Sequence, residues 1–170
     1  MKVARSGSME AVAAEVRESL GEAWLPRLYR ERVLPLRTRA HEIPSAKKGA
    51  PEVLVQHTLL GIELKVGRRR LSCPDLATAR YLAVFARLGS TSVAVPYDIT
   101  KISPLADELE STWHRMLLLV EHLTEGRTGA FRRRVRSALV GEVRQEIAEA
   151  GAGALIPQFN QNTKQRSRSI

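Results

Sequence analysis

The sequence predicts an α/β fold, with a mixed central sheet flanked by helices and a C-terminal pair of helices. Two patterns predict it. The stretch VLVQHTLLGIELKV, residues 53–66, is rich in β-branched and apolar residues, which is typical of strands. At about 14 residues it is too long for one strand, so we expect two. On both sides of it, apolar residues recur with the 3.6-residue period of amphipathic helices.

Capping and turn residues set the expected bounds of the elements. Ser6-Gly7-Ser8 suits the N-cap of a first helix, and Gly89 suits a C-cap. Ser103-Pro104 suits the start of a long helix. We expect helices at Met9–Leu20, Pro26–Val33, Pro74–Leu88, Leu105–Leu123 and Phe131–Glu149, a buried strand at Ser92–Tyr97, an exposed loop at Thr38–Ala50 and a turn at Gly67–Arg70. The chain then divides into an α/β core (1–102), a helical extension (103–150) and a mobile basic tail (151–170).

The charge balance is strongly basic. Lys and Arg number 27 against 18 acidic residues, for a formal net charge of +9 and a pI near 10.4. Such an excess favours a polyanionic partner, nucleic acid or an anionic membrane surface, and a basic surface without any ligand is the alternative. Aromatic residues make up only 5%, which disfavours an extended base-stacking platform.

Other features of composition narrow the class of protein. The single cysteine, Cys73, excludes an internal disulfide and a cysteine-based zinc site. No run of about 18 apolar residues is present, so we expect no membrane insertion. The first residues lack the apolar core of a secretory signal. We therefore predict a cytoplasmic protein without a membrane partner.

The candidate chemistry lies in the strand-rich stretch. Glu63 and Lys65 are two residues apart on an expected strand, so their side chains leave the same face of the sheet. If the chain reverses at His57-Thr58, Glu52 falls opposite Glu63, and two carboxylates so close repel unless a cation lies between them. Mg²⁺, or Mn²⁺ in its place, is the expected cation. Lys65 would then orient or deprotonate a water, or stabilise the charge on a phosphate.

The chain reversal decides whether this site exists. A single straight strand would separate Glu52 from Glu63 by about 36 Å, too far to share a metal. His57-Thr58 lacks the Asn-Gly or Gly that tight hairpins favour, so a looser turn through His57 to Leu60 is the alternative.

Pro51-Glu52, followed by Ile62-Glu63-Leu64-Lys65, resembles the signature of the PD-(D/E)XK nuclease superfamily. The basic turn, helix and short apolar strand that follow are similar to the archaeal-type Holliday-junction resolvases, over roughly residues 6–98. The resemblance implies a restriction-endonuclease-like core and Mg²⁺-dependent cleavage of DNA, with Glu52 and Glu63 as metal ligands and Lys65 as a catalytic residue. Ser45 and Glu15 (or Glu10) occupy places comparable to the family's loop serine and helix glutamate. Glu52 replaces the usual Asp, and the short gap to Glu63 also departs from the family, which leaves a non-catalytic member open.

Three groups of basic residues are the expected nucleic-acid contacts. They are Lys47 and Lys48 in the exposed loop, Arg68, Arg69 and Arg70 in the turn, and Arg132, Arg133, Arg134 and Arg136 on one face of the last helix. A solvated helix face is the alternative for the last group. We further expect a homodimer, with the apolar faces of the last two helices as the interface.

Three functions are compatible with these features. The first is a metal-dependent endonuclease that acts on DNA rather than RNA. The second is a non-catalytic nucleic-acid-binding or assembly protein that keeps the fold without the metal. The third is a protein-interaction subunit whose basic tail contacts an acidic partner or RNA. Salt dependence of nucleic-acid binding separates the second from the third.

Overall fold

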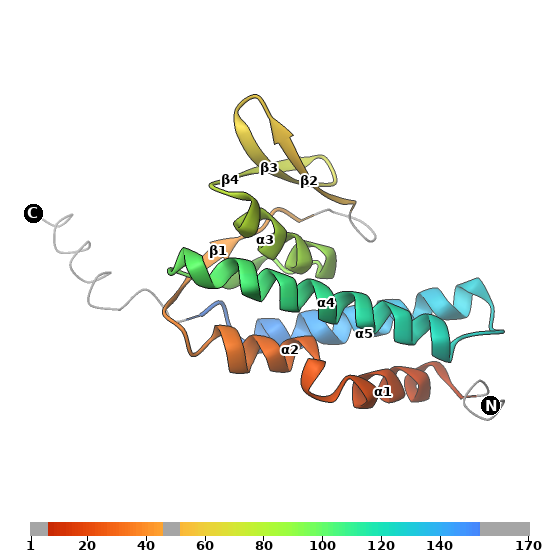
Figure 1. Cartoon of the computed structure of the whole chain (residues 1–170). Helices are drawn as coiled ribbons and strands as arrows, with labels where there is room; N and C mark the ends of the chain where they lie inside the picture. The colour runs from red at the N-terminus through yellow and green to blue at the C-terminus, as the bar shows by residue number, and fades with distance from the viewer. Residues whose placement is uncertain (1–6, 46–51, 154–170) are drawn as a thin grey trace, which may run out of the picture.

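The computed structural model of the chain describes residues 7–45 and 52–153 (Figure 1). The elements are α1 Met9–Leu20, the 3₁₀ turn η2 Gly21–Ala23, α2 Leu25–Leu28, the π-helical turn η3 Tyr29–Val33, β1 Thr38–Glu42, β2 Val53–Thr58, β3 Gly61–Val66, β4 Arg69–Cys73, α3 Leu76–Leu88, β5 Ser92–Pro96, α4 Ile99–Leu123 and α5 Gly129–Ala150. The expected basic tail lies outside the described residues apart from residues 151–153.

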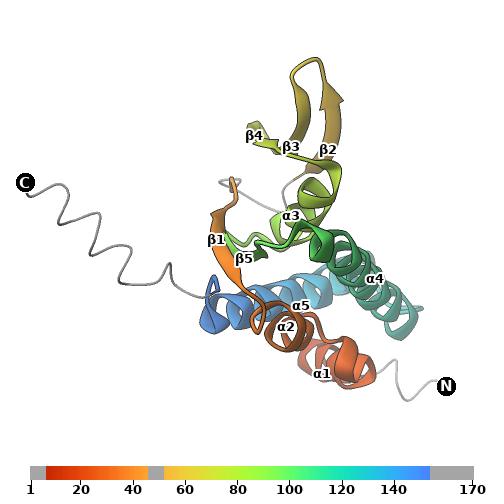
Figure 2. The same cartoon turned by 60° about the vertical axis from the view of Figure 1, so that its left-hand side comes forward.

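The helices pack into one body, from which the β2–β3 hairpin projects (Figures 1 and 2). α1 packs against both α4 and α5, and α4 packs along α3. The buried hydrophobic side chains form one cluster that runs from Val12 on α1 to Ile147 on α5. This cluster takes side chains from both sides of the expected boundary between residues 102 and 103.

The amphipathic helices follow the expectation from periodicity and capping. Ser8 caps α1, because its Oγ accepts a hydrogen bond from the Ala11 amide at 3.2 Å. Asp75 caps α3 in the same way, through the Thr78 amide at 2.7 Å. Gly89 ends α3 with a left-handed φ of +81°, a conformation that favours glycine.

The strands form two separate antiparallel sheets. β1 pairs with β5, and β2, β3 and β4 form a three-stranded meander. The fold is therefore a mixed α/β one with C-terminal helices, as predicted. The single mixed central sheet was wrong for the described residues, in which every strand pair is antiparallel.

Two buried tyrosines explain why β5 does not join a larger sheet. The Ala94 amide donates to Tyr29 Oη at 2.9 Å, and Tyr81 Oη donates to the Ala94 carbonyl at 2.5 Å. β1 occupies the other edge of β5. The two hydroxyls thus take the backbone groups that a further strand would pair. Burial raises the pKa of both tyrosines, which keeps each hydroxyl protonated and able to donate.

The three-stranded sheet rests on α3 by one face only. Leu64, Val66 and Cys73 on that face are buried, whereas most side chains on the opposite face are exposed or half-buried. Burial also raises the pKa of the Cys73 thiol, so that the thiol stays neutral and poorly nucleophilic. One face of the sheet therefore packs on α3, and the other face is largely accessible to solvent.

Three elements differ from the expectation by the largest margin. β1 lies where we expected only a loop, and β4 begins within the expected turn and runs on to Cys73. α4 begins at Ile99 instead of Leu105, because Asp98 Oδ1 accepts from the Thr100 amide and caps the helix earlier. Pro104 lies inside α4, although a proline disfavours helix in the residue before it.

The apolar faces of the last two helices are buried within the chain. Leu109 and Met116 on α4, and Leu139 and Val143 on α5, are all at most 1% exposed. The predicted dimer interface on these faces was therefore wrong. No helix among residues 7–45 and 52–153 combines the length and the apolar character needed to cross a membrane.

Candidate nucleic-acid interface

The β2–β3 hairpin contains the chain reversal on which the metal site depends. Its two strands pair with Val53 opposite Val66 and Thr58 opposite Gly61. The turn is therefore Leu59-Leu60, beyond the His57-Thr58 reversal and inside the looser alternative. Gly61 follows the turn with φ +123°, a backbone conformation that an L side chain rarely adopts.

This register separates the two predicted metal ligands. Glu63 lies opposite Gln56, and the Glu52 carbonyl accepts from the Gly67 amide at 2.8 Å at the far end of the hairpin. Glu52 lies four residues before Gln56, the position opposite Glu63, which is about 13 Å along the strand. The predicted pairing of Glu52 with Glu63 was wrong, and these two residues do not fit a shared Mg²⁺ or Mn²⁺ site. Among the described residues, no three His, Cys, Asp or Glu side chains gather into a group that could hold a metal ion.

Glu63 and Lys65 lie on the same outer face of β3, in line with the expected alternation. The Glu63 carboxylate accepts from Gln56 Nε2 at 3.2 Å and pairs with Arg70 Nε at 3.4 Å. Its side chain is only 19% exposed. Glu63 therefore bridges β2 and β4 across the sheet, and its partners are an amide and a guanidinium instead of a second carboxylate.

The other predicted catalytic residues do not converge on Glu63. Glu15 is exposed on α1, which packs on α4 and α5 at the opposite side of the body from the hairpin (Figure 1). Ser45 follows the segment Glu42–Pro44, which faces Arg69, Arg70 and Leu71 across a shallow groove. Lys47 and Lys48 lie outside the described residues, in the segment that joins Ser45 to Glu52.

Four basic residues lie where β3 turns into β4, with Lys65 and Arg70 on the outer face of the sheet and Arg69 on the opposite face, opposite Val66. Lys65, Arg68, Arg69 and Arg70 form what we call the basic sheet end. Lys65 and Arg70 are directly opposite each other on neighbouring strands, and like charges in such positions destabilise a sheet. Arg70 pairs with Glu63, whereas Lys65, Arg68 and Arg69 form no ion pair with another described residue. The arrangement concentrates positive charge at one end of a sheet, at a cost to its stability.

The four arginines of α5 do not share one face. Arg132 and Arg136 are half-buried, and Arg132 Nε donates to Thr124 Oγ1 on the preceding turn at 3.2 Å. Arg133 and Arg134 are exposed, with Arg134 lying 6.0 Å from the Phe131 ring centroid. The prediction of a common arginine face was therefore wrong, because consecutive helix positions rotate by about 100°. Two of the four arginines are therefore exposed, and the other two are half-buried.

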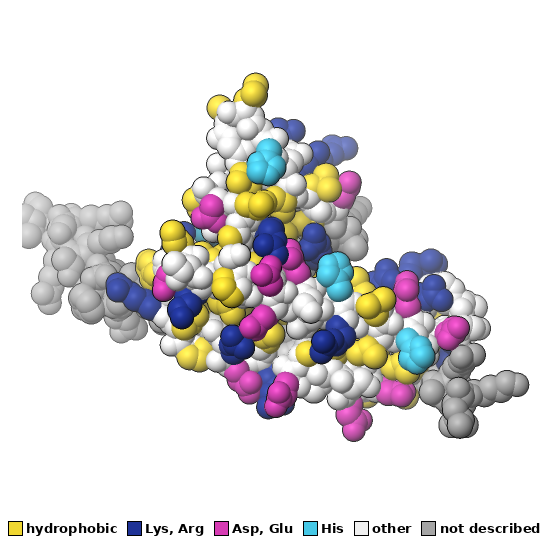
Figure 3. Space-filling model, in the orientation of Figure 1, with side chains coloured by type: hydrophobic (Ala, Val, Ile, Leu, Met, Phe, Trp, Pro, Cys, Tyr) yellow, Lys and Arg dark blue, Asp and Glu magenta, His cyan; other side chains and the backbone are white. Residues whose placement is uncertain are grey.

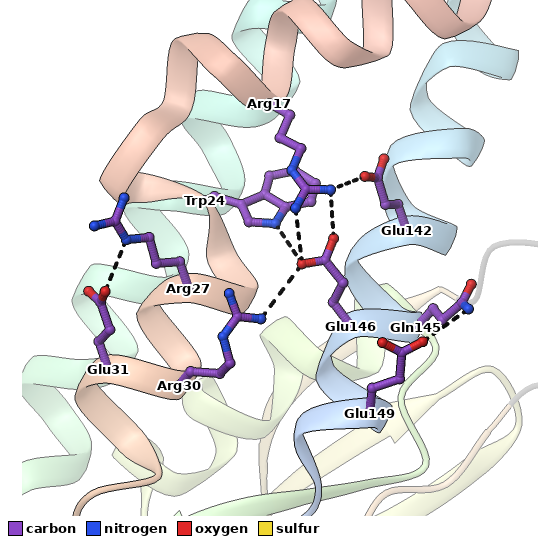
Figure 4. Close-up of polar contacts among 9 residues, drawn as sticks. All are labelled: Arg17, Trp24, Arg27, Arg30, Glu31, Glu142, Gln145, Glu146 and Glu149. Carbon is purple, nitrogen blue, oxygen red and sulfur yellow. Dashed lines mark hydrogen bonds and ion pairs between the residues drawn. The ribbon is translucent and has the colours of Figure 1, made fainter.

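A second polar cluster joins α1 and α2 to α5 (Figure 4). Glu146 accepts from Trp24 Nε1 at 3.2 Å and pairs with Arg17 at 2.8 Å and Arg30 at 3.7 Å. Arg17 also pairs with Glu142 and lies over the Trp24 ring. The charges in this cluster are matched within the chain. We therefore assign it the role of holding α1 and α2 against α5, not of binding a ligand.

The stability of the helical body gives a test of that role. We expect Glu146→Gln to lower the free energy of unfolding by about 1–2 kcal/mol, because Arg17 and Arg30 lose a half-buried anion. Urea unfolding measures it. Glu149→Gln is the matched control, since Glu149 accepts only from Gln145 at 3.1 Å in an exposed position. Equal loss in both variants would contradict the assignment.

The basic excess is unevenly distributed along the chain. Seven of the 27 Lys and Arg residues and none of the 18 acidic residues fall outside the described ranges, which leaves 20 basic against 18 acidic residues inside them. The described fold is thus nearly neutral as a whole. Within the described residues, any attraction for a polyanion would come from local clusters, of which the basic sheet end is one.

Sequence reasoning missed one exposed feature of the same sheet. Leu59 and Leu60 at the hairpin tip are fully exposed, at 106% and 98%. Gly61 was the signal that could have placed this turn.

Comparisons with known protein families, with curated proteins and with solved structures found no match to the chain. The resemblance to the PD-(D/E)XK nucleases thus stays a prediction from the sequence pattern.

Proposed function

We propose that the protein binds nucleic acid, DNA in preference to RNA, through contacts between the basic sheet end and backbone phosphates. The observation that carries the proposal is a set of three cations, Lys65, Arg68 and Arg69, that form no ion pair with another described residue. They lie beside Arg70, whose charge Glu63 partly offsets. Guanidinium and ammonium groups are the usual ligands of phosphate oxygens, and such contacts position a protein without reading the base sequence.

The cross-strand placement of two cations supports the proposal. Lys65 and Arg70 repel each other across the β3–β4 pair, and the ion pair of Arg70 with Glu63 partly offsets this repulsion. A bound phosphate would remove the conflict, because it supplies the negative charge that the free sheet lacks. The groove between Arg69–Leu71 and Glu42–Pro44 leaves the β4 side of the cluster accessible.

Binding does not require hydrolysis. Glu52 and Glu63 are too far apart to share one metal, so the proposal follows the non-catalytic alternative. Glu63 then acts as a partner of Gln56 and Arg70 and holds the basic sheet end in place.

Salt dependence tests the proposed function directly. We expect the full chain to bind a labelled 30-base-pair DNA duplex with a log–log slope against salt of about −3.6 or steeper, the value for four phosphate contacts. Fluorescence anisotropy between 50 and 400 mM NaCl measures it. Absence of binding, or a flat dependence, would overturn the proposal.

A cleavage assay on the same duplex, and on branched and single-stranded DNA, separates binding from catalysis. The assay is run with Mg²⁺ and with Mn²⁺, on the wild-type chain and on Glu63→Ala. Metal-dependent cleavage that is lost in Glu63→Ala would restore the endonuclease hypothesis and overturn the non-catalytic proposal.

A further inference from the structure

The tip of the β2–β3 hairpin is unusual in two respects, its turn residues and the exposure of its apolar side chains. Tight turns favour Gly, Asn, Asp, Pro and Ser, whereas this turn consists of Leu59 and Leu60. Both side chains are fully exposed. The turn joins β2 to β3 at the end of the hairpin that projects from the body (Figure 2). Because no other described residue covers these two side chains, packing within the described fold does not explain them.

The hairpin has an apolar tip, and its cations lie at the opposite end of β3. No charged residue lies between Val53 and Ile62, which includes the tip. The cations begin at Lys65, five residues beyond Leu60 and so about 17 Å from the tip at about 3.3 Å per residue. Figure 3 shows apolar side chains at the tip of the projection and Lys or Arg side chains along one flank behind it.

We infer that Leu59 and Leu60 form an apolar wedge that inserts between base pairs of duplex DNA while the basic sheet end holds the adjoining phosphates. The inference rests on the proposed function and adds to it the double-stranded substrate and its deformation. A two-stranded ribbon fits within a DNA groove. Leucine is one of the side chains that unstack base steps when they enter the duplex. The separation of tip and cations, about 17 Å, matches about five base pairs at about 3.4 Å each.

A lipid bilayer fits the same hairpin less well. The two leucine side chains hold eight carbons together, fewer than the single myristoyl chain that gives only marginal membrane binding. The hairpin also carries no Trp or Tyr, the residues that gather at membrane interfaces. The cations complement phosphates in both cases, so the experiment has an arm for each.

The test replaces the wedge without changing the turn. Leu59 and Leu60 both have negative φ, as no non-glycine residue among those described has a positive one. Ser and Asn suit such a turn, so Leu59→Ser/Leu60→Asn keeps the hairpin and removes the apolar tip. Leu59→Met/Leu60→Met keeps an apolar tip. Ile99→Asn/Leu118→Ser is the matched control, because it makes equally polar two leucine-sized side chains that are 69% and 66% exposed.

Two signals on one duplex report insertion. A 2-aminopurine base brightens when its step is unstacked, and energy transfer between dyes at the two ends rises when the duplex bends. We expect the full-length wild type, the Met variant and the control to give both signals. We expect Leu59→Ser/Leu60→Asn to lose both and to bind roughly tenfold more weakly with an unchanged salt slope, because its phosphate contacts remain.

The outcomes separate this inference from the proposed function. Salt-dependent binding by the wild type without unstacking or bending overturns the wedge and leaves the proposed function standing. Unchanged signals in the Ser/Asn variant also overturn the wedge. No salt-dependent binding by the wild type overturns the proposed function itself. Leucine-dependent binding to phosphatidylcholine vesicles with 30% phosphatidylserine, without leucine-dependent DNA signals, would assign the tip to a membrane surface and overturn the wedge.

Discussion

Replacing Lys65, Arg68 and Arg69 by Gln together is expected to weaken DNA binding by two to three orders of magnitude at about 0.1 M salt. Each lost phosphate contact removes about 0.9 from the log–log salt slope, so three lost contacts flatten it by about 2.7. These three residues are chosen because they have no acidic partner among the described residues, and their removal leaves the Glu63–Arg70 pair intact. Anisotropy titrations at several salt concentrations measure both quantities.

A second triple variant with the same change in net charge controls for the effect of total charge on DNA binding. Arg87→Gln, Lys101→Gln and Arg115→Gln remove three cations from α3 and α4, none of which belongs to the basic sheet end. We expect this control to keep most of the affinity and a slope within about one unit of wild type. If the two triple variants lose equal affinity, binding follows total charge and the basic sheet end has no special role.

Tyr29→Phe is expected to lower the free energy of unfolding by about 2–4 kcal/mol. The Tyr29 hydroxyl accepts from the Ala94 amide at 2.9 Å and donates to the Gly151 carbonyl at 2.6 Å. Phenylalanine leaves both groups without this partner, and each unsatisfied buried group costs about 1–3 kcal/mol. Thermal unfolding should show a midpoint lower by roughly 5–15 °C, at about 2–4 °C per kcal/mol for a chain of this size.

Tyr97→Phe is the matched control for Tyr29→Phe. Tyr97 is 50% exposed and lies against Arg37, so its hydroxyl has access to water. We expect a change within about 0.5 kcal/mol. A Tyr29→Phe variant as stable as Tyr97→Phe would contradict the view that tyrosine hydroxyls close the free edge of β5.

The helices were the most predictable part of the fold. Ser8, Asp75 and Gly89 are local signals whose hydrogen bonds or backbone angles are decided within one turn. The predicted start of α4 was wrong because a second capping residue lies upstream of the expected one. Asp98 starts α4 before Pro104, and Pro104 is then accommodated inside the helix.

The strands were less predictable because their partners are distant in sequence. β1 and β4 are polar edge strands that expose most of their side chains, so neither shows an alternating apolar pattern. The merging of all strands into one sheet was prevented by Tyr29 and Tyr81, which reach β5 from separate helical segments. No local pattern in the sequence reveals such a contact.

The predicted metal site was wrong because the predicted register of β2 against β3 was wrong. The alternation of side chains between the two faces of a strand correctly placed Glu63 and Lys65 on one face. However, shifting the pairing of two strands by an even number of residues leaves every side chain on the same face. The predicted and observed pairings differ by such a shift, since Glu63 lies opposite Gln56 instead of Glu52. Only the turn could have decided between them, and Leu59-Leu60 carries no turn signal apart from Gly61 behind it.

Mapping of backbone amide chemical shifts tests the central claim most directly. The full chain, labelled with ¹⁵N, is titrated with a DNA duplex at low salt. We expect the largest shifts at Lys65 to Leu71, with a second group at Leu59 and Leu60. Largest shifts on α5 around Arg133 and Arg134, with the amides of β3 and β4 unmoved, would contradict the claim that the basic sheet end is the nucleic-acid contact.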